Sequence, residues 1–301
     1  MNRYSVRPAA MSDIEAVYEL IAEQRTIDFG SPMISLEDLQ KRWEATDLDT
    51  DTITALEEGN VAGYAELYEG DTPFIYLASR NDLDLGYQLL HSLEQQAIAR
   101  TNGTVELVTQ ISEKNQPLIQ LFASSGYRSN LSFIIMELKL DKLPESPKWA
   151  EGISVRSFVK SQDEEATYRT DEEAGEDKGY HTPLSYEGWV KRMDMDRETF
   201  DPDIWFLACD GNEIVGAALN ICDPNVSIVW VDHLSVRRAW RKRGIGKALL
   251  LHSFAEFYKR GIKTAKLSVD SKSLTNAPRL YESVGMRTIQ QYHIYRKELR
   301  M

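Results

Sequence analysis

The sequence predicts a layered α/β protein made of two similar domains in tandem. Three observations favour this fold class. The chain has 301 residues, which exceeds the usual size of one domain. Its two halves repeat the same order of strand-like and helix-like patterns. In the second half, a β-branched strand pattern leads through a glycine-rich turn into an apolar helix pattern, so strands and helices alternate within one domain.

The repeat is visible in four pairs of segments. Residues 4–8 correspond to 153–157, each a short strand before an amphipathic segment. Residues 53–68 correspond to 205–220, and each pair of strands flanks a Gly-Asn turn of the hairpin type. Residues 74–78 and the helix after them correspond to the strand, turn and helix of the second half, and 105–127 correspond to 266–286. The repeat therefore predicts a first domain at 1–142 and a second at 153–301.

The segment 143–152 between the two copies contains two prolines among polar residues, which is typical of a linker. After it, residues 161–193 are expected to form one or two helices before the second hairpin. Eight acidic residues lie between Asp163 and Asp177. They either form a solvated helix face or attract a cationic ligand.

Residues 227–247 are the part of the chain with the clearest chemical character. The apolar run from Ile228 to Val236 is interrupted by Asp232 and His233, as in a mostly buried strand. Six of the eleven residues from 237 to 247 are basic, and Gly244 and Gly246 precede an apolar helix pattern. A helix start has unpartnered N–H groups and partial positive charge, and glycines let a bulky anion approach the backbone. This segment therefore predicts a polyphosphate site.

Two common phosphate loops do not fit this spacing. The Walker A pattern needs four residues between its first glycine and Gly-Lys, and the Rossmann pattern needs a third glycine where this chain has Leu249. The spacing Arg241-x-x-Gly244-x-Gly246 does fit the acyl-CoA motif, so the segment resembles the GCN5-related N-acetyltransferase (GNAT) superfamily. Residues 269–286 resemble its second signature, with Ser273 and Met286 as departures and matches at Val269, Asp270, Ala277, Leu280, Tyr281, Glu282 and Gly285.

The resemblance implies more about fold and activity. It implies that each domain is a mixed, mainly antiparallel sheet flanked by helices, with splayed central strands, and that the tandem arrangement is similar in architecture to the mycothiol synthases. It also implies an acetyl-CoA-dependent N-acetyltransferase that acts on a primary amine of a small molecule, or alternatively on a peptide or protein amine. The cofactor-binding residues that it implies are Leu234, Ser235, Val236, Arg241, Lys242, Arg243, Gly244, Ile245, Gly246, Lys247 and Ala277.

Two residues are candidates for proton transfer. Tyr281 would protonate the departing thiolate, because a phenol held near the sulfur can act as a general acid. Asp232 precedes Leu234 by two residues on the same strand face, so its carboxylate could accept the amine proton directly or through water. His233 is expected to point to the opposite face and to be structural. An acyl-CoA-binding sensor or scaffold without catalysis is the alternative function, and it needs neither proton donor nor acceptor.

The first domain is predicted to be a degenerate copy. Where the second has Arg241-Lys242-Arg243-Gly244, the first has Asn81-Asp82-Leu83-Asp84, and Phe122 replaces Tyr281. The carboxylate of Asp84 in place of Gly244 would repel pyrophosphate. Residues 1–145 hold 11 basic and 24 acidic residues, a balance of −13, whereas the rest hold 24 and 23. Only the second half suits an anionic co-substrate.

The composition limits the other function classes. The net charge of −12 argues against non-specific binding of nucleic acid. No apolar run is long enough for a membrane helix, and the N-terminal residues lack the apolar core of a signal peptide, so a cytoplasmic protein is expected. We expect it to be a monomer or a homodimer. Cys209 and Cys222 lie in apolar strand patterns, which favours reduced thiols over a disulfide framework or a metal site.

Overall fold

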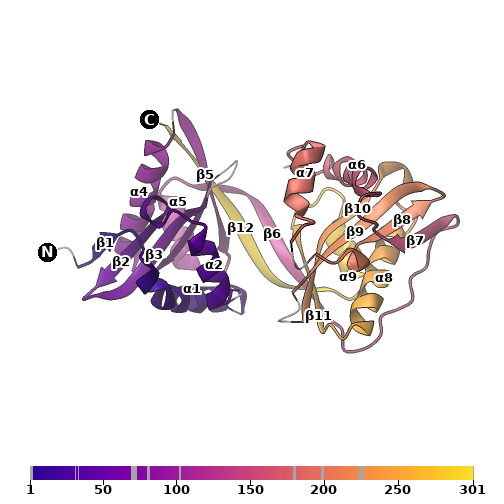
Figure 1. The fold of residues 1–301 in the computed structure, drawn as a ribbon, viewed down its shortest axis with the longest axis horizontal. Coiled ribbons are helices and arrows are strands. Elements are labelled where there is room, and N and C mark those ends of the chain that lie inside the picture. Colours follow the sequence, from indigo (N-terminus) through magenta and orange to yellow (C-terminus); the bar gives the residue numbers. More distant parts are fainter. Residues whose placement is uncertain are drawn as a thin grey trace. The chain divides into compact units, whose positions relative to one another are not determined.

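The computed structural model describes residues 3–30, 32, 34–68, 73–79, 82–101, 103–178, 181–197, 200–223 and 227–300. The chain forms two compact units, one of residues 1–133 with 290–301 and one of residues 134–289. Figure 1 labels the helices and strands of both units. The predicted fold class is confirmed, because each unit combines a sheet with flanking helices.

The first unit contains the N-terminal copy of the repeat. Its strands β1 to β5 are neighbours in chain order, and β4 is antiparallel to β3 but parallel to β5. The strands are β1 (Ser5–Arg7), β2 (Thr52–Glu57), β3 (Asn60–Tyr68), β4 (Phe74–Ser79), β5 (Thr104–Ser112) and the first part of β6 (Arg128–Lys139). The helices are α1 (Ile14–Phe29), α2 (Leu36–Glu44), α3 (Leu48–Asp51), α4 (Leu83–Ala99) and α5 (Gln116–Ser124).

The last strand of the chain, β12 (Arg287–Arg300), belongs to the first unit from Gln290 onward. It pairs antiparallel with β5, with Tyr292 opposite Ser112 and Arg300 opposite Thr104. This strand satisfies backbone groups of β5 that would otherwise form a sheet edge. The compact units therefore differ from the sequence-based ranges 1–142 and 153–301. The strand β12 comes last in the chain, but it forms its hydrogen bonds with β5 of the first unit.

The second unit contains residues 227–247, the segment with the predicted polyphosphate site. Its sheet has the order β6, β11, β10, β9, β8, β7. After β6, its strands are β7 (Ile153–Ser157), β8 (Phe206–Asp210), β9 (Glu213–Asp223), β10 (Ile228–Val236) and β11 (Thr264–Asp270). The helices are α6 (Glu164–Gly175), α7 (Tyr186–Met193), α8 (Ile245–Lys259) and α9 (Ala277–Glu282). The β8–β9 hairpin turns at Gly211, whose φ is 59°, so the predicted Gly-Asn turn is confirmed.

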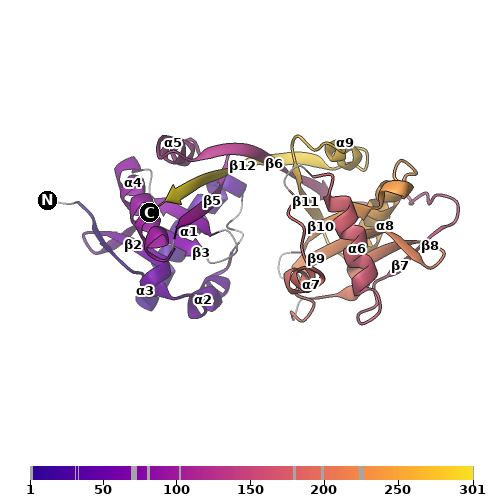
Figure 2. The same cartoon turned by 90° about the horizontal axis from the view of Figure 1, so that it is seen from above.

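Helices α6 and α8 cover opposite faces of this sheet. Along β10, His233 and Ser235 bond to a carboxylate of α6. The alternate residues Leu234 and Val236 lie within 4 Å of the position that a Cβ on Gly246 of α8 would take. The helices can be followed in Figure 2, which views the same structure from above. Because strand residues alternate between faces, β10 presents one set of side chains to each helix.

Strands β10 and β11 separate beyond their first residues. They pair in parallel at Ile228 to Trp230, opposite Thr264 to Lys266, and the remainder of both strands, all of it described, has no further pairing between them. On its other side, β10 stays paired with β9 as far as Val236. The backbone groups of β10 that face β11 are therefore open from Val231 onward, in agreement with the expected splayed strands.

Three further predictions concern the helices after the linker, the cysteines and membrane-spanning segments. Helices α6 and α7 occupy the segment where one or two helices were expected. Cys209 is buried in β8, and burial raises the pKa of its thiol, which disfavours the reactive thiolate. In the part of the chain that the structure describes, no helix is both long and apolar enough to cross a bilayer.

Candidate active site

A cavity of about 610 Å³ lies in the second unit, where β10 and β11 separate and α8 begins. Side chains or backbone of α6, β10, β11 and α9 also line it, together with the turn before α8. The structure thereby brings together residues from 174 to 281. The predicted site residues that line the cavity are Asp232, Leu234, Val236, Arg241, Lys242, Gly244, Ile245, Gly246, Lys247, Ala277 and Tyr281.

The N-terminus of α8 is open toward this cavity. Gly244 is the N-cap residue, with a φ of 81° that an L-residue adopts only with strain, and no side chain caps the helix. A Cβ added at Gly244 would meet no atom within 4 Å, whereas one at Gly246 would lie 3.4 Å from Leu280. The first N–H groups of the helix therefore point into a space that a ligand can occupy.

Two of the predicted cofactor residues do not line the cavity. Ser235 is buried, and its hydroxyl donates to Asp171 at 2.6 Å. Arg243 instead donates a hydrogen bond to the carbonyl oxygen of Glu151 at 3.1 Å and lies 3.8 Å from Asp210. The side chain of Arg243 thus connects the turn to the segment before β7.

The basic residues of the turn are divided between paired and unpaired groups. Asp177, after the C-terminal end of α6, accepts hydrogen bonds from Arg238, at 2.8 Å, and from Arg241. These bonds lower the pKa of Asp177 to about 2, so it is ionised at neutral pH. Within the described residues, Lys242 and Lys247 form no ion pair.

Ion pairs also involve several of the acidic residues between Asp163 and Asp177. Several of these carboxylates are paired with arginines, and Glu165 is solvated as well as paired. Asp163 binds Arg156 in a bidentate pair, Glu173 lies 2.7 Å from Arg237, and Asp177 binds the turn. The carboxylates at the C-terminal end of α6 are therefore counterions of the basic turn, which leaves little free negative charge to attract an amine.

Asp232 and His233 lie together at the splayed part of β10. The pairing with β9 shifts register between Val231 and His233, so Asp232 occupies a bulge and its side chain is 47% exposed. His233 does face α6, as expected, but it also lines the cavity, and its Nε2 lies 3.4 Å from Asp232 Oδ2. The structural role expected for His233 stays a prediction, and the sequence did not indicate that the residue also lines the cavity.

Tyr281 reaches the cavity from α9. The side chain is 9% exposed, and its backbone oxygen accepts hydrogen bonds from Val284 at 3.2 Å and Met286 at 3.1 Å. These bonds close the turn at Gly285, whose φ is 92°. The ring is thus held by a short helix with a fixed end, and it lines the same cavity as Asp232 and the start of α8.

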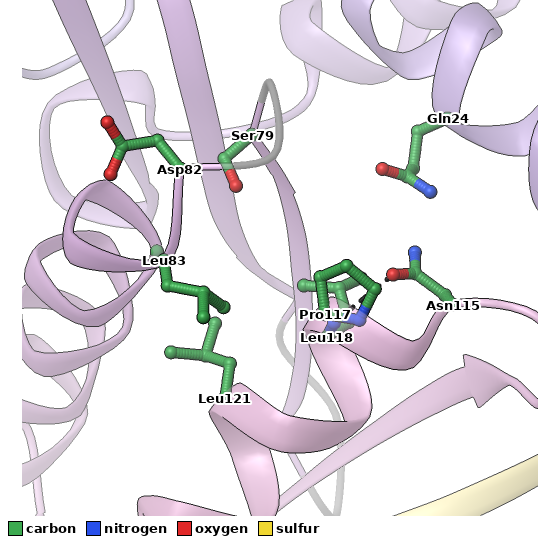
Figure 3. A pocket seen from close by; sticks show the side chains of 9 residues that line it. Gln24, Ser79, Asp82, Leu83, Asn115, Pro117, Leu118 and Leu121 are labelled. Atoms are coloured by element: carbon green, nitrogen blue, oxygen red, sulfur yellow. Dashed lines mark hydrogen bonds between the residues drawn. The ribbon is translucent and has the colours of Figure 1, made fainter.

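The corresponding place in the first unit is nearly filled. Asp82 is the N-cap residue of α4, and its carboxylate accepts a hydrogen bond from Leu85 N at 3.0 Å. By its position Asp82, rather than Asp84, is the counterpart of Gly244, and Asn81 lies outside the described residues. The space between α4, β4 and α5 measures about 10 Å³, room for about one water molecule. Figure 3 shows Leu83 and Leu121 pointing toward one another across it.

A larger hollow of about 880 Å³ lies beside the start of α4 in the same unit. Its charged lining is dominated by carboxylates, which would repel phosphate groups. Arg3 is the one basic residue among the described residues that line it, against Glu19, Glu57, Glu58, Asp82 and Asp84.

For the described part of the whole chain, no group of three or more His, Cys, Asp or Glu side chains is placed to hold a metal ion.

Asp171, Asp177 and His233 were not identified as site residues from the sequence. Asp171 and Asp177 were included in an acidic run, and nothing in their spacing distinguishes a buried carboxylate from a solvated one. Asp171 lies 64 residues from Ser235, and Asp177 lies 64 residues from Arg241. The only available signal was His233 itself, a polar residue next to Asp232 in an otherwise apolar strand.

Comparisons with known proteins agree with this geometry. Residues 165–286 match the model of the acetyltransferase (GNAT) family. A GCN5-related N-acetyltransferase from Sphaerobacter thermophilus is 32% identical, with a TM-score of 0.86, and the match covers 100% of this chain and 97% of that one. A tandem GNAT protein from the clavulanic acid biosynthesis pathway has a TM-score of 0.73 at 13% identity over 98% of both chains, which concerns the fold alone.

Among curated proteins, a mycothiol acetyltransferase from Streptomyces scabiei is 31% identical over 159 residues, or 52% of this chain. That match covers 49% of the relative, so this chain spans about half the length of that protein. A mycothiol acetyltransferase from Amycolatopsis mediterranei is 26% identical over 77% of this chain and 79% of its own length.

Proposed function

Because the chain belongs to the GCN5-related N-acetyltransferase family, we propose that it transfers an acetyl group from acetyl-CoA to a primary amine of a small molecule. The main support for this proposal is the cavity of the second unit. An open helix start, an open strand edge and a buried tyrosine all line it. The mycothiol acetyltransferase from Streptomyces scabiei matches about half of this chain at 31% identity, which supports acetyl transfer in general and leaves the choice of acceptor open.

The pyrophosphate of acetyl-CoA would lie at the start of α8. The unpartnered N–H groups after Gly244 would donate to its oxygens, and Lys242 and Lys247 would supply charge without first breaking an ion pair. The pantetheine arm would then extend along β10 beside Leu234 and Val236. Its amides would use the backbone groups that the separation from β11 leaves open, as an added strand does.

The chemistry would take place where this arm ends. The amine nitrogen attacks the thioester carbonyl, a carbon–nitrogen bond forms, and the carbon–sulfur bond then breaks to release the thiolate. A backbone N–H of the splayed β10 would face the negative oxygen of the tetrahedral intermediate. Tyr281 would donate its proton to the sulfur, and the carboxylate of Asp232 would help to remove the proton of the amine.

We propose that the first unit takes no part in this chemistry. Its counterpart of the cofactor cavity holds about 10 Å³, and the carboxylate of Asp82 already occupies the helix start that a phosphate would need. Phe122 stands in place of Tyr281: its backbone oxygen accepts from Tyr127 N at 3.0 Å, just as Tyr281 accepts from Met286 N. The phenyl ring keeps the packing and lacks the proton.

The test of the proposed function is a turnover assay. The intact protein is incubated with acetyl-CoA and a panel of primary amines that includes sugars, amino acids, polyamines and short peptides. Release of the CoA thiol and a matching acetylated product in the mass spectrum are expected with at least one small amine. Binding of acetyl-CoA without transfer to any panel member would favour the sensor or scaffold function. Transfer to peptides alone would replace the small-molecule acceptor.

Replacing Asp177 with asparagine should strengthen the binding of acetyl-CoA. Asp177 competes with the pyrophosphate for Arg241, and the substitution removes the competing charge while keeping the shape. Because the pair is partly exposed, we expect a gain of about two- to fivefold at low salt, decreasing as salt screens the charges. Since the pKa of Asp177 is about 2, the gain should not change between weakly acidic and neutral pH.

Titration calorimetry at two salt concentrations measures this effect. Glu165→Gln is the matched control, because Glu165 pairs with Arg169 on the same helix and does not line the cavity. Equal affinity of wild type and Asp177→Asn at low salt would contradict a phosphate-binding role for Arg241.

A further inference from the structure

His233 has an arrangement that the proposed function does not yet use. Its ring is only 12% exposed and lies between two carboxylates. Nδ1 is 2.7 Å from Oδ2 of Asp171, which is buried on α6. Nε2 is 3.4 Å from Oδ2 of Asp232, which is half exposed at the bulge of β10. One ring nitrogen therefore faces the protein interior and the other faces the cavity.

The surroundings of Asp171 determine which nitrogen carries the proton. Besides His233, Asp171 accepts hydrogen bonds from Ser235 Oγ at 2.6 Å and Trp189 Nε1 at 3.0 Å. Burial raises the pKa of Asp171, but the hydrogen bonds from His233, Ser235 and Trp189 hold that pKa below its usual value. Asp171 is thus ionised and can only accept hydrogen bonds.

It follows that Nδ1 of His233 donates its N–H to Asp171, because two acceptors at 2.7 Å would repel each other. In the neutral ring, Nε2 then has a lone pair on the side of Asp232, and both residues line the cavity. The charged groups around this ring are Asp171 on α6 and Asp232 on β10, and Tyr281 on α9 lines the same cavity.

We infer that His233 is the group that takes the proton from the attacking amine, that Asp171 is its positioning residue, and that Asp232 passes the proton on to solvent. This inference rests on the proposed acetyl transfer. The amine nitrogen loses one proton to Nε2 and forms its bond to the carbonyl carbon. The resulting imidazolium lies between two carboxylates. The imidazolium then gives its proton to Asp232, which passes it to water. Tyr281 protonates the sulfur and regains a proton from the solvent.

Among its described residues, the first unit lacks this arrangement, which agrees with chemistry in the second unit alone. Helices α1 and α6 begin alike, since Asp13 and Asp163 are N-cap residues that each bind an arginine of the preceding strand. Asp171 is the eighth residue after Asp163, and the eighth residue after Asp13 is Ile21, which is buried. An apolar side chain therefore replaces the carboxylate that would orient a histidine.

Kinetics of two variants provide the first test. His233→Gln should lower kcat by about a hundredfold or more, the usual contribution of a general base, while the dissociation constant of acetyl-CoA measured by calorimetry stays the same. Asp232→Asn should cost less, because Nε2 still accepts the proton and water replaces the second acceptor. A larger loss for Asp232→Asn than for His233→Gln would overturn the inference and leave Asp232 as the direct base.

Nitrogen-15 NMR of the histidine rings provides a readout that needs no turnover. The His233 signals are identified by their loss in His233→Gln. In the wild type we expect a protonated Nδ1 and an unprotonated Nε2 at the pH where the ring is neutral. Asp171→Asn should move the proton to Nε2, because the side-chain amide can donate to Nδ1, and kcat should fall with unchanged affinity for acetyl-CoA.

Asp163→Asn is the matched control, since Asp163 is a buried carboxylate of the same helix that binds Arg156 outside the cavity. It should change neither the tautomer nor kcat. If Asp171→Asn does not fold, the wild-type spectrum alone decides, because a proton on Nε2 there would overturn the inference. Absence of any acetyl transfer by the wild type would overturn the proposed function as well, whereas transfer with an unaltered kcat in His233→Gln overturns the inference alone.

Discussion

Replacing Tyr281 with phenylalanine should lower turnover by about a hundredfold or more and leave the affinity for acetyl-CoA unchanged. The substitution removes one hydroxyl group and keeps the ring that packs in the core. The first unit already has Phe122 at this position, with the same backbone hydrogen bond to the residue after the glycine turn. We therefore assign the loss to proton donation to the leaving thiolate, and the affinity for acetyl-CoA checks that the packing is kept.

Two measurements make this result specific. Steady-state kinetics with the best amine of the panel give kcat, and calorimetry gives the dissociation constant of acetyl-CoA. Tyr258→Phe is the control, because Tyr258 lies on α8 with 37% of its surface exposed and does not line the cavity. An unchanged kcat in Tyr281→Phe would remove Tyr281 from the mechanism, and weaker binding of acetyl-CoA would assign it to packing.

Replacing Gly244 with aspartate should weaken the binding of acetyl-CoA by about a hundredfold or more, since each lost hydrogen bond to a charged group costs roughly 1.5–3 kcal/mol. A Cβ there meets no protein atom, so the side chain can enter the space where the pyrophosphate is proposed to lie. Its carboxylate would repel the phosphates and compete for the N–H groups of α8, as Asp82 does with Leu85 in the first unit.

The control for this variant is Gly261→Asp. Gly261 follows the other end of α8, has a φ of 77°, and likewise has no atom within 4 Å of an added Cβ. Both substitutions bring the same charge and a comparable strain of roughly 1–2 kcal/mol. Only the change at Gly244 should affect acetyl-CoA. Equal affinity of the two variants would show that the phosphate site lies elsewhere.

The parts of the fold that depend on local sequence were predictable. The hairpin turn at Gly211 and the helix after Gly244 are encoded by residues that are neighbours in the chain. Most of the residues that the motif around Arg241 to Gly246 predicts to bind the cofactor line one cavity, because the start of a helix follows its preceding strand directly in the chain. The second motif, around Tyr281, predicted residues of α9 that line the same cavity.

The remaining features depend on partners that are distant in the sequence. Strand β12 carries a strand pattern, yet the pattern does not say which sheet it joins, and it pairs with β5 from Gln290 onward in the first unit. The role of His233 depends on Asp171, which lies 62 positions earlier in an acidic helix. The bulge at Asp232 shifts the register in a way that period-two alternation cannot predict.

The number of acetyl-CoA molecules bound per intact chain tests the central claim most directly, namely that one of two similar units has the cofactor site. Calorimetric titration of the wild type should give one site, and the Gly244→Asp variant should lose it. Asp82→Gly in the first unit should not create a second site, because the space between α4, β4 and α5 holds only about 10 Å³ and the larger hollow at the start of α4 is lined mainly by carboxylates. Two equivalent sites in the wild type, or one site that survives in Gly244→Asp, would contradict the account.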